Sequence, residues 1–129
     1  MDITNNLIQI KNLKNETLDF DDKLSSNKSL LIKNSSNLKI IINSKINKIT
    51  VENSNQIFIS VQKLISGIEI SDSKHVLISL VTFIGSDESI SFIPCIELYK
   101  SELYLIGDKN KYQDIKITCH LSEIYQIEV

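Results

Sequence analysis

Apolar and polar residues alternate along most of this chain, and the alternating segments repeat at a fixed interval. Three consecutive segments, beginning at Leu30, Ile49 and Ile68, superpose without a gap at a period of 19 residues. Because the alternation has a period of two, it indicates β-strands and not helices. Apolar residues fill six equivalent positions: Leu30, Ile49, Ile68; Ile32, Val51, Ile70; Leu38, Ile57, Val76; Ile40, Ile59, Ile78; Ile42, Val61, Leu80; Ile46, Ile65, Ile84.

A repeat of this length predicts a right-handed parallel β-helix. Nineteen residues are too few for a strand and a crossover helix, but they suit one turn of short strands bent at corners. Strands of successive turns stack about 4.8 Å apart, so equivalent apolar side chains form internal ladders. Asn34, Asn53 and Asp72, each followed by serine, predict a corner because these residues tolerate left-handed backbone. The handedness is the usual one for parallel connections.

Looser copies of the pattern flank the three regular segments. Residues 8–10 alternate before them, and 90–92 and 103–105 continue the pattern afterwards. The chain ends in two short apolar stretches, 115–117 and 124–127, which we interpret as a C-terminal β-hairpin that holds Cys119 as a small packed residue. No linker interrupts the pattern, so residues 1–129 are expected to form one domain.

Composition and charge exclude several classes of function. Hydrophobic residues make up 42% of the chain and charged residues 23%, which is typical of a globular protein. The net charge is −2, and all 14 basic residues are lysines. A nucleic-acid partner is therefore not expected, since such binders usually carry a basic excess and arginines. The longest apolar run has three residues, 40–42, so we expect no membrane span.

The sequence also lacks the residues of a catalytic or metal site. His75 and His120 are the only histidines, and with Cys95 and Cys119 they do not give four zinc ligands at a recognised spacing. His75 follows Lys74 in a predicted turn, where a solvated side chain is expected. The three glycines form no phosphate-binding loop. We therefore expect no enzyme activity, no catalytic residue, no cofactor and no metal. Two cysteines without a secretion signal indicate reduced thiols in the cytoplasm.

Four motifs follow one another from residue 45 onwards: Lys45-Ile46-Asn47-Lys48-Ile49, Val51-Glu52-Asn53-Ser54, Ile65-Ser66-Gly67-Ile68-Glu69-Ile70 and Asp72-Ser73-Lys74. In content and order they resemble the C-terminal domain of the cyclase-associated proteins, and the stretch before residue 45 resembles it more loosely, through Asp21-Asp22 and Ser36-Asn37-Leu38. The family's Cys is replaced by Ser54 and one of its serines by Leu121. The 44 preceding residues cannot hold the family's helical domain and proline-rich tracts, so a stand-alone minimal member is expected.

This resemblance implies a function and an assembly. Relatives fold as a right-handed parallel β-helix, bind monomeric actin with a preference for its ADP form, and accelerate nucleotide exchange. They also dimerise by exchanging the C-terminal hairpin. The resemblance thus implies a cytoplasmic, cytoskeleton-associated homodimer. The residues expected at the dimer contact are Ile115, Ile117, Cys119, Leu121, Ile124 and Ile127.

Candidate actin contacts are charged residues at outward positions of the regular turns: Lys45, Lys48, Glu52, Glu69 and Lys74. Each is equally compatible with an ordinary solvated surface. One alternative is a relative of tubulin-folding cofactor C, which stimulates GTP hydrolysis with an arginine; this chain has none. Another is a generic β-helix scaffold that binds other proteins, surfaces or carbohydrate without binding actin.

Overall fold

The fold consists entirely of β-strands in the part of the chain that the structure describes. The computed structural model describes residues 2–4, 6–20, 25–84, 87–90, 92–107 and 114–128, with the backbone alone for 2–4, 81–84 and 87–90. The strands are β1 (Asp2–Thr4), β2 (Leu7–Lys11), β3 (Lys14–Asp19), β4 (Ser29–Lys33), β5 (Ser36–Glu52), β6 (Asn55–Ser71), β7 (Lys74–Ser79), β8 (Val81–Ile84), β9 (Asp87–Ile90), β10 (Cys95–Tyr99), β11 (Glu102–Gly107), β12 (Lys116–His120) and β13 (Glu123–Glu128).

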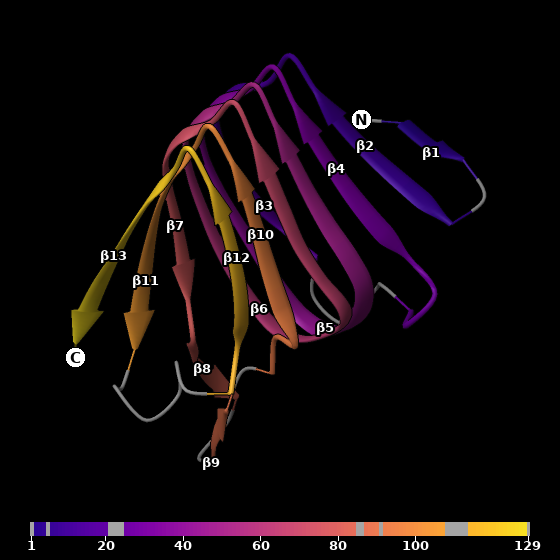
Figure 1. Ribbon diagram of the computed structural model, residues 1–129. Coiled ribbons are helices and arrows are strands. Elements are labelled where there is room, and N and C mark those ends of the chain that lie inside the picture. Colours follow the sequence, from indigo (N-terminus) through magenta and orange to yellow (C-terminus); the bar gives the residue numbers. More distant parts are fainter. Residues whose placement is uncertain are drawn as a thin grey trace.

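These strands form a parallel β-helix of about five turns, which confirms the expected fold (Figure 1). Two parallel sheets meet at one corner. The first sheet contains β2, β4, residues 48–52 of β5, residues 67–71 of β6, β10 and β12. The second sheet contains β3, residues 36–42 of β5, residues 55–61 of β6, β7, β11 and β13. At the N-terminal end, β1 pairs antiparallel with β2.

The internal ladders form as predicted at five of the six positions. Ile49, for example, pairs with Leu30 on one side and Ile68 on the other. Burying these side chains removes apolar surface from water, which is the main stabilising contribution to the fold. Each of the 15 ladder residues is at most 2% exposed: Leu30, Ile32, Leu38, Ile40, Ile42, Ile49, Val51, Ile57, Ile59, Val61, Ile68, Ile70, Val76, Ile78 and Leu80.

The prediction for the sixth ladder position is wrong. Ile46 pairs with Leu64, which is buried, whereas Ile65 is 47% exposed. The cause is a pair of compensating β-bulges: β5 has one extra residue between Ile42 and Lys45, and β6 has one between Leu64 and Gly67. The extra residue in β5 shortens the interval between paired residues from 19 to 18, so Ile46 lies opposite residue 64 instead of residue 65. The side chain of Ile84 lies outside the described residues.

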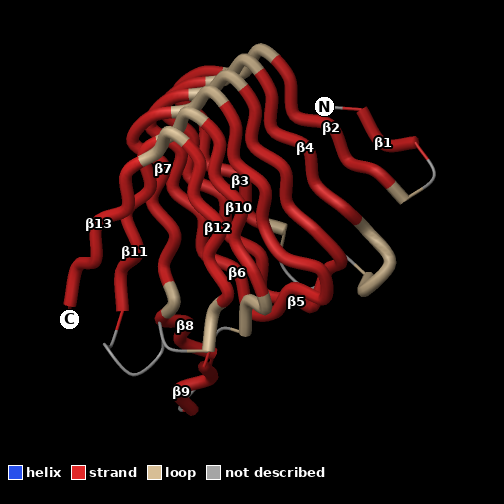
Figure 2. The backbone as a smooth tube through the Cα atoms, viewed as in Figure 1, coloured by secondary structure: helices blue, strands red, loops and turns tan. Residues whose placement is uncertain are grey.

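The predicted corner is confirmed by the backbone conformation. Asn34, Asn53 and Asp72 have φ values of 52°, 46° and 48°. At the same corner in the last two turns, Lys100 and Leu121 have φ values of 47° and 52°. Figure 2 shows these corners as a line of loops along one edge of the molecule. A second left-handed residue follows three positions later in four of the turns: Asn15, Asn37, Gln56 and His75.

A ladder of serines runs through the corner, and we call it the serine ladder. It contains Ser35, Ser54, Ser73, Ser101 and Ser122. Each of the first four serines donates its backbone N–H to the hydroxyl of the next, over 2.9–3.2 Å. Each hydroxyl donates to the carbonyl two residues earlier in its own turn, over 2.8–3.0 Å. Because the first four side chains are buried, these hydrogen bonds satisfy polar groups that water does not reach.

Residues 81–84 and 87–90 leave the helix instead of continuing the pattern. Strands β8 and β9 pair antiparallel with each other in a separate two-stranded sheet. The expectation that residues 90–92 restart the coil is confirmed at Phe92, which forms a parallel bridge to Lys63 of β6, whereas Ile90 still belongs to β9. The regular coil resumes at β10, where Leu98 pairs with Ile70, 28 residues earlier.

The expected C-terminal hairpin is also wrong. Within the chain, β12 pairs parallel with β10, and β13 pairs parallel with β11. Leu121 and Ser122 form the corner between these strands, so residues 116–128 add a last turn to the coil. Cys119 is exposed instead of packed, because it lies at the open end of the helix.

The ladder register predicts opposite outcomes for two adjacent substitutions. Val51→Asp places a carboxylate between Ile32 and Ile70, where it has no partner. We expect this variant to lose several kcal/mol or to remain unfolded. Glu52→Gln, one residue further and facing outward, should change stability by less than about 0.5 kcal/mol. Urea denaturation compares them, and similar midpoints would contradict the register.

A second prediction tests the serine ladder. Ser73→Ala removes the acceptor of the Ser54 N–H and the donor to the Ser71 carbonyl. Since Ser73 is fully buried, we expect a loss of about 1–3 kcal/mol. The control is Ser60→Ala, which lies outside the corner on the outward side of β6. Equal unfolding midpoints for the two variants would show that the ladder hydrogen bonds are not stabilising.

Candidate functional site

The outward side of the first sheet brings three of the five candidate residues together. Lys48 and Glu52 project from β5 and Glu69 from β6. The Lys48 Nζ lies 2.6 Å from the Glu69 Oε1. The two side chains are 34% and 46% exposed, so this ion pair contributes little to stability and both groups stay accessible to a partner.

The other two candidates lie apart from this group. Lys45 is exposed at the bulge where the chain bends away from the first sheet, and it pairs with Lys63. Lys74 begins β7 in the second sheet, around the corner. Three of the candidates therefore share the outward side of the first sheet, Lys45 lies at the adjoining bend, and Lys74 lies around the corner.

This surface also contains three residues that the sequence analysis did not identify. Glu97 and Tyr99 of β10 and Thr118 of β12 lie in register with Glu69, Ser71 and one another. They line a shallow depression of about 240 Å³. Its lining consists of Thr50, Glu52, Glu69, Ile70, Ser71, Glu97, Leu98, Tyr99 and Thr118.

Stacked side chains fix the corner end of this surface. The Tyr99 and His120 rings are 5.4 Å apart and nearly parallel, at 3°. The Lys100 Nζ lies 5.3 Å from the centre of the Tyr99 ring. Exposed aromatic rings next to cations suit contact with another protein, because they combine apolar area with polar interactions.

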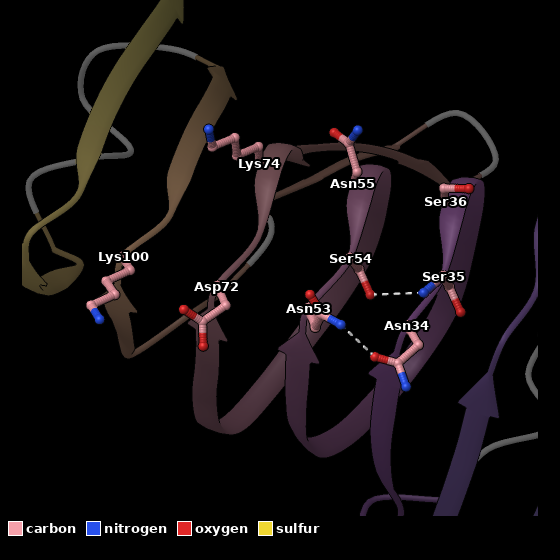
Figure 3. A pocket seen from close by; sticks show the side chains of 9 residues that line it. All are labelled: Asn34, Ser35, Ser36, Asn53, Ser54, Asn55, Asp72, Lys74 and Lys100. Carbon is pink, nitrogen blue, oxygen red and sulfur yellow. Dashed lines mark hydrogen bonds between the residues drawn. The ribbon is translucent and has the colours of Figure 1, made fainter.

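A polar groove of about 560 Å³ follows the corner itself (Figure 3). The Asn53 Nδ2 donates to the Asn34 Oδ1 over 2.7 Å, so the amides form a row along the groove. Lys74 and Lys100 lie beside Asp72 at its other end. The lining residues are Asn34, Ser35, Ser36, Asn53, Ser54, Asn55, Asp72, Lys74 and Lys100.

On the second sheet, two tyrosines are bound to carboxylates. The Tyr104 hydroxyl donates to the Glu102 Oε1 over 2.9 Å, and the Tyr125 hydroxyl donates to the Glu123 Oε2. The hydrogen bond to Glu102 raises the pKa of Tyr104. The hydrogen bond and charge of Glu123 raise the pKa of Tyr125 to about 12. His75 is exposed as expected, but its Nδ1 lies 3.1 Å from the Glu102 Oε1 and its ring stacks on Tyr104.

These surfaces offer charges, hydrogen bonds and flat sheet faces. Among the described residues, no group of three His, Cys, Asp or Glu side chains could hold a metal ion. The described part of the chain also contains no helix long and apolar enough to cross a membrane. The outward side of the first sheet therefore has the means to bind a protein partner.

Comparison with known proteins agrees with this geometry. The crystal structure of cyclase-associated protein from Cryptosporidium parvum is similar over 94% of this chain and 69% of that chain, with a TM-score of 0.76 and 21% sequence identity. None of the curated proteins matches the sequence significantly. The family model "Adenylate cyclase associated (CAP) C terminal" matches residues 1–105. The match thus includes the stretch before residue 45, where the resemblance of the motifs is looser. The chain therefore belongs to the family of adenylate cyclase-associated protein C-terminal domains, which is known generally for actin binding.

Proposed function

We propose that this domain binds monomeric actin, preferentially its ADP form, and promotes exchange of the bound nucleotide. The proposal rests on the chain's membership of the adenylate cyclase-associated protein C-terminal family. The family is not an enzyme family, so the domain acts through binding alone. Residues 1–129 act as one domain, and the site of action is the cytoplasm, next to the actin cytoskeleton.

The proposed actin contact is the outward side of the first sheet with the adjoining bend. It combines Lys45 and the Lys48–Glu69 pair with the depression formed by Glu97 and Tyr99. Mixed charges on a flat face favour a specific orientation of the partner more than they favour raw affinity. Lys74, around the corner, can contact only a partner that also reaches the corner groove.

Promotion of exchange follows from selective binding. A partner accelerates nucleotide release only if it binds an actin conformer with an open nucleotide cleft more tightly than the closed conformer. The two sheets share one packed core, and the serine ladder joins their corners. A surface held this firmly can favour one actin conformer without losing binding energy to its own rearrangement.

We also propose that the domain dimerises by exchanging its last turn, residues 115–128. Ile115, Ile117 and Ile124 pack partly buried against the core, so a second copy's residues could replace them. Strands β12 and β13 end the sheets, and uncovered strand edges favour pairing with another chain. Cys119 and Leu121 are exposed at this end, whereas Ile127 projects from the outward side of the second sheet.

The exchange activity has a direct test. Release of a fluorescent nucleotide from ADP-actin should accelerate as the protein is added and then saturate. A two-fold dimer should bind two actins, because it presents each surface twice. Binding without faster release would keep the partner and refute the mechanism. No binding to either ADP- or ATP-actin would refute the proposed function.

Charge reversal tests the location of the actin contact. Lys45→Glu with Lys48→Glu should weaken actin binding, and the loss should shrink as salt concentration rises. Neither residue belongs to an internal ladder, so the thermal midpoint should stay close to that of the parent. Lys14→Glu with Lys39→Glu on the second sheet is the matched control. Equal affinities for the two double variants would place the contact elsewhere.

Deletion tests the dimer. Sedimentation should show a dimer of the intact protein at concentrations on the order of tens of micromolar. Removing residues 115–129 should abolish it and expose the edge of β10 and β11, so this variant should aggregate more readily. A monomeric intact protein would refute the exchange, whatever the deleted variant does.

A further inference from the structure

The outward side of the second sheet carries a row of large apolar side chains. Phe58, Leu77, Tyr104 and Tyr125 lie in register on four consecutive strands. Ile106 and its partner Ile127 extend the row towards the bend. We call these six residues the apolar strip. The Tyr104 and Tyr125 rings stack at 5.0 Å, which holds the strip in a regular order.

This strip is unlike the corresponding surface of the first sheet. There the central row reads Thr50, Glu69, Glu97 and Thr118, which is the polar pattern of a solvent-facing sheet. In the strip, Tyr125 is 43% exposed and Ile127 41%. A contiguous apolar face is normally covered by another layer, so the strip indicates a surface that a partner covers.

The charges on one side of the strip define the partner. Glu102 and Glu123 lie side by side in the ladder, between the tyrosines and the corner. Two neighbouring carboxylates repel each other, and a cation placed between them relieves that repulsion. Among the described residues, the basic group in contact with them is His75, through Glu102. Lysine or arginine on the partner would complement these carboxylates and would also approach the tyrosine rings.

The spacing of the strip matches a helix better than a strand. Its rows lie about 4.8 Å apart, the distance between strands. Neighbours on one helix face are about 5–6 Å apart, whereas alternate residues of a strand are about 6.6 Å apart. Three strand intervals span about 14 Å, the length of nine or ten helical residues. Ser60 lies beside the strip, and its small, partly exposed side chain leaves room for a helix to approach the sheet.

We propose that the apolar strip binds an amphipathic helix of another protein, whose apolar stripe is bordered by lysine or arginine. The helix lies along the axis of the coil, with its basic border over Glu102 and Glu123. This binding does not depend on the proposed actin contact, because it uses the other sheet.

Two side-chain-stapled helical peptides of about 14 residues test the proposal. Both carry leucine at every third or fourth position; one has lysines along the border, and the other has glutamates. Fluorescence anisotropy should show that the parent protein binds the lysine peptide at least about tenfold more tightly than the glutamate peptide. Leu77→Ser with Tyr125→Ser should weaken binding of the lysine peptide by at least about tenfold.

Two controls separate this site from general stickiness. Tyr99→Ser removes an exposed aromatic ring from the first sheet and should leave binding of the lysine peptide unchanged. Glu102→Gln with Glu123→Gln should reduce the preference for lysine over glutamate while the apolar contact remains. The proposal would be overturned if the two peptides bound equally well or if neither bound. It would also be overturned if Tyr99→Ser weakened binding of the lysine peptide as much as Leu77→Ser with Tyr125→Ser does. It would also fail if Leu77→Ser alone, which leaves residues 115–128 intact, abolished a dimer seen by light scattering, since the strip would then cover a second copy.

Discussion

One hydrogen-bonded row, the serine ladder, keeps the turns of this β-helix in register. At each of four corners a buried hydroxyl joins the backbone of its own turn to the backbone of the preceding one. The left-handed residue just before each serine makes the sharp change of direction possible. The two sheets meet at this corner, so their strands stay aligned over the whole length. Every surface described above depends on that alignment.

Side chains alternate between inward and outward positions along these aligned strands, and the two sheets carry different outward surfaces. The inward positions of both sheets are almost uniformly Ile, Leu or Val. Outward positions are free of that constraint, and they differ: charged and hydroxyl groups on the first sheet, aromatic and aliphatic groups on the second. This fold can therefore present two distinct binding faces, because its backbone is satisfied internally and its outward side chains are not needed for packing.

Sequence reasoning found the parts of the fold that repeat and missed the parts that do not. The ladder around Val51 and the corner at Asn53 follow from local periodicity and turn chemistry. That Leu64 and not Ile65 faces the core does not follow from the sequence, since a bulge can be recognised only once two strands are paired. Glu97 and Tyr99 were missed because the departure of β8 and β9 changes the interval from 19 to 28 residues. The two C-terminal strands were mistaken for a hairpin because a tight corner and a hairpin turn have similar composition.

The β8–β9 excursion has a consequence for how this fold can change. It leaves the coil on the side away from the serine corner, and the next turn still resumes with Leu98 opposite Ile70. The number of residues in a turn can therefore vary at the edge opposite the serine corner, whereas the serine corner itself keeps the same length in each turn. Insertions at the opposite edge can lengthen the chain, or carry new loops, without disturbing either sheet. Residues can therefore be added at the edge where β8 and β9 leave the coil, while the serine corner keeps the turns in register.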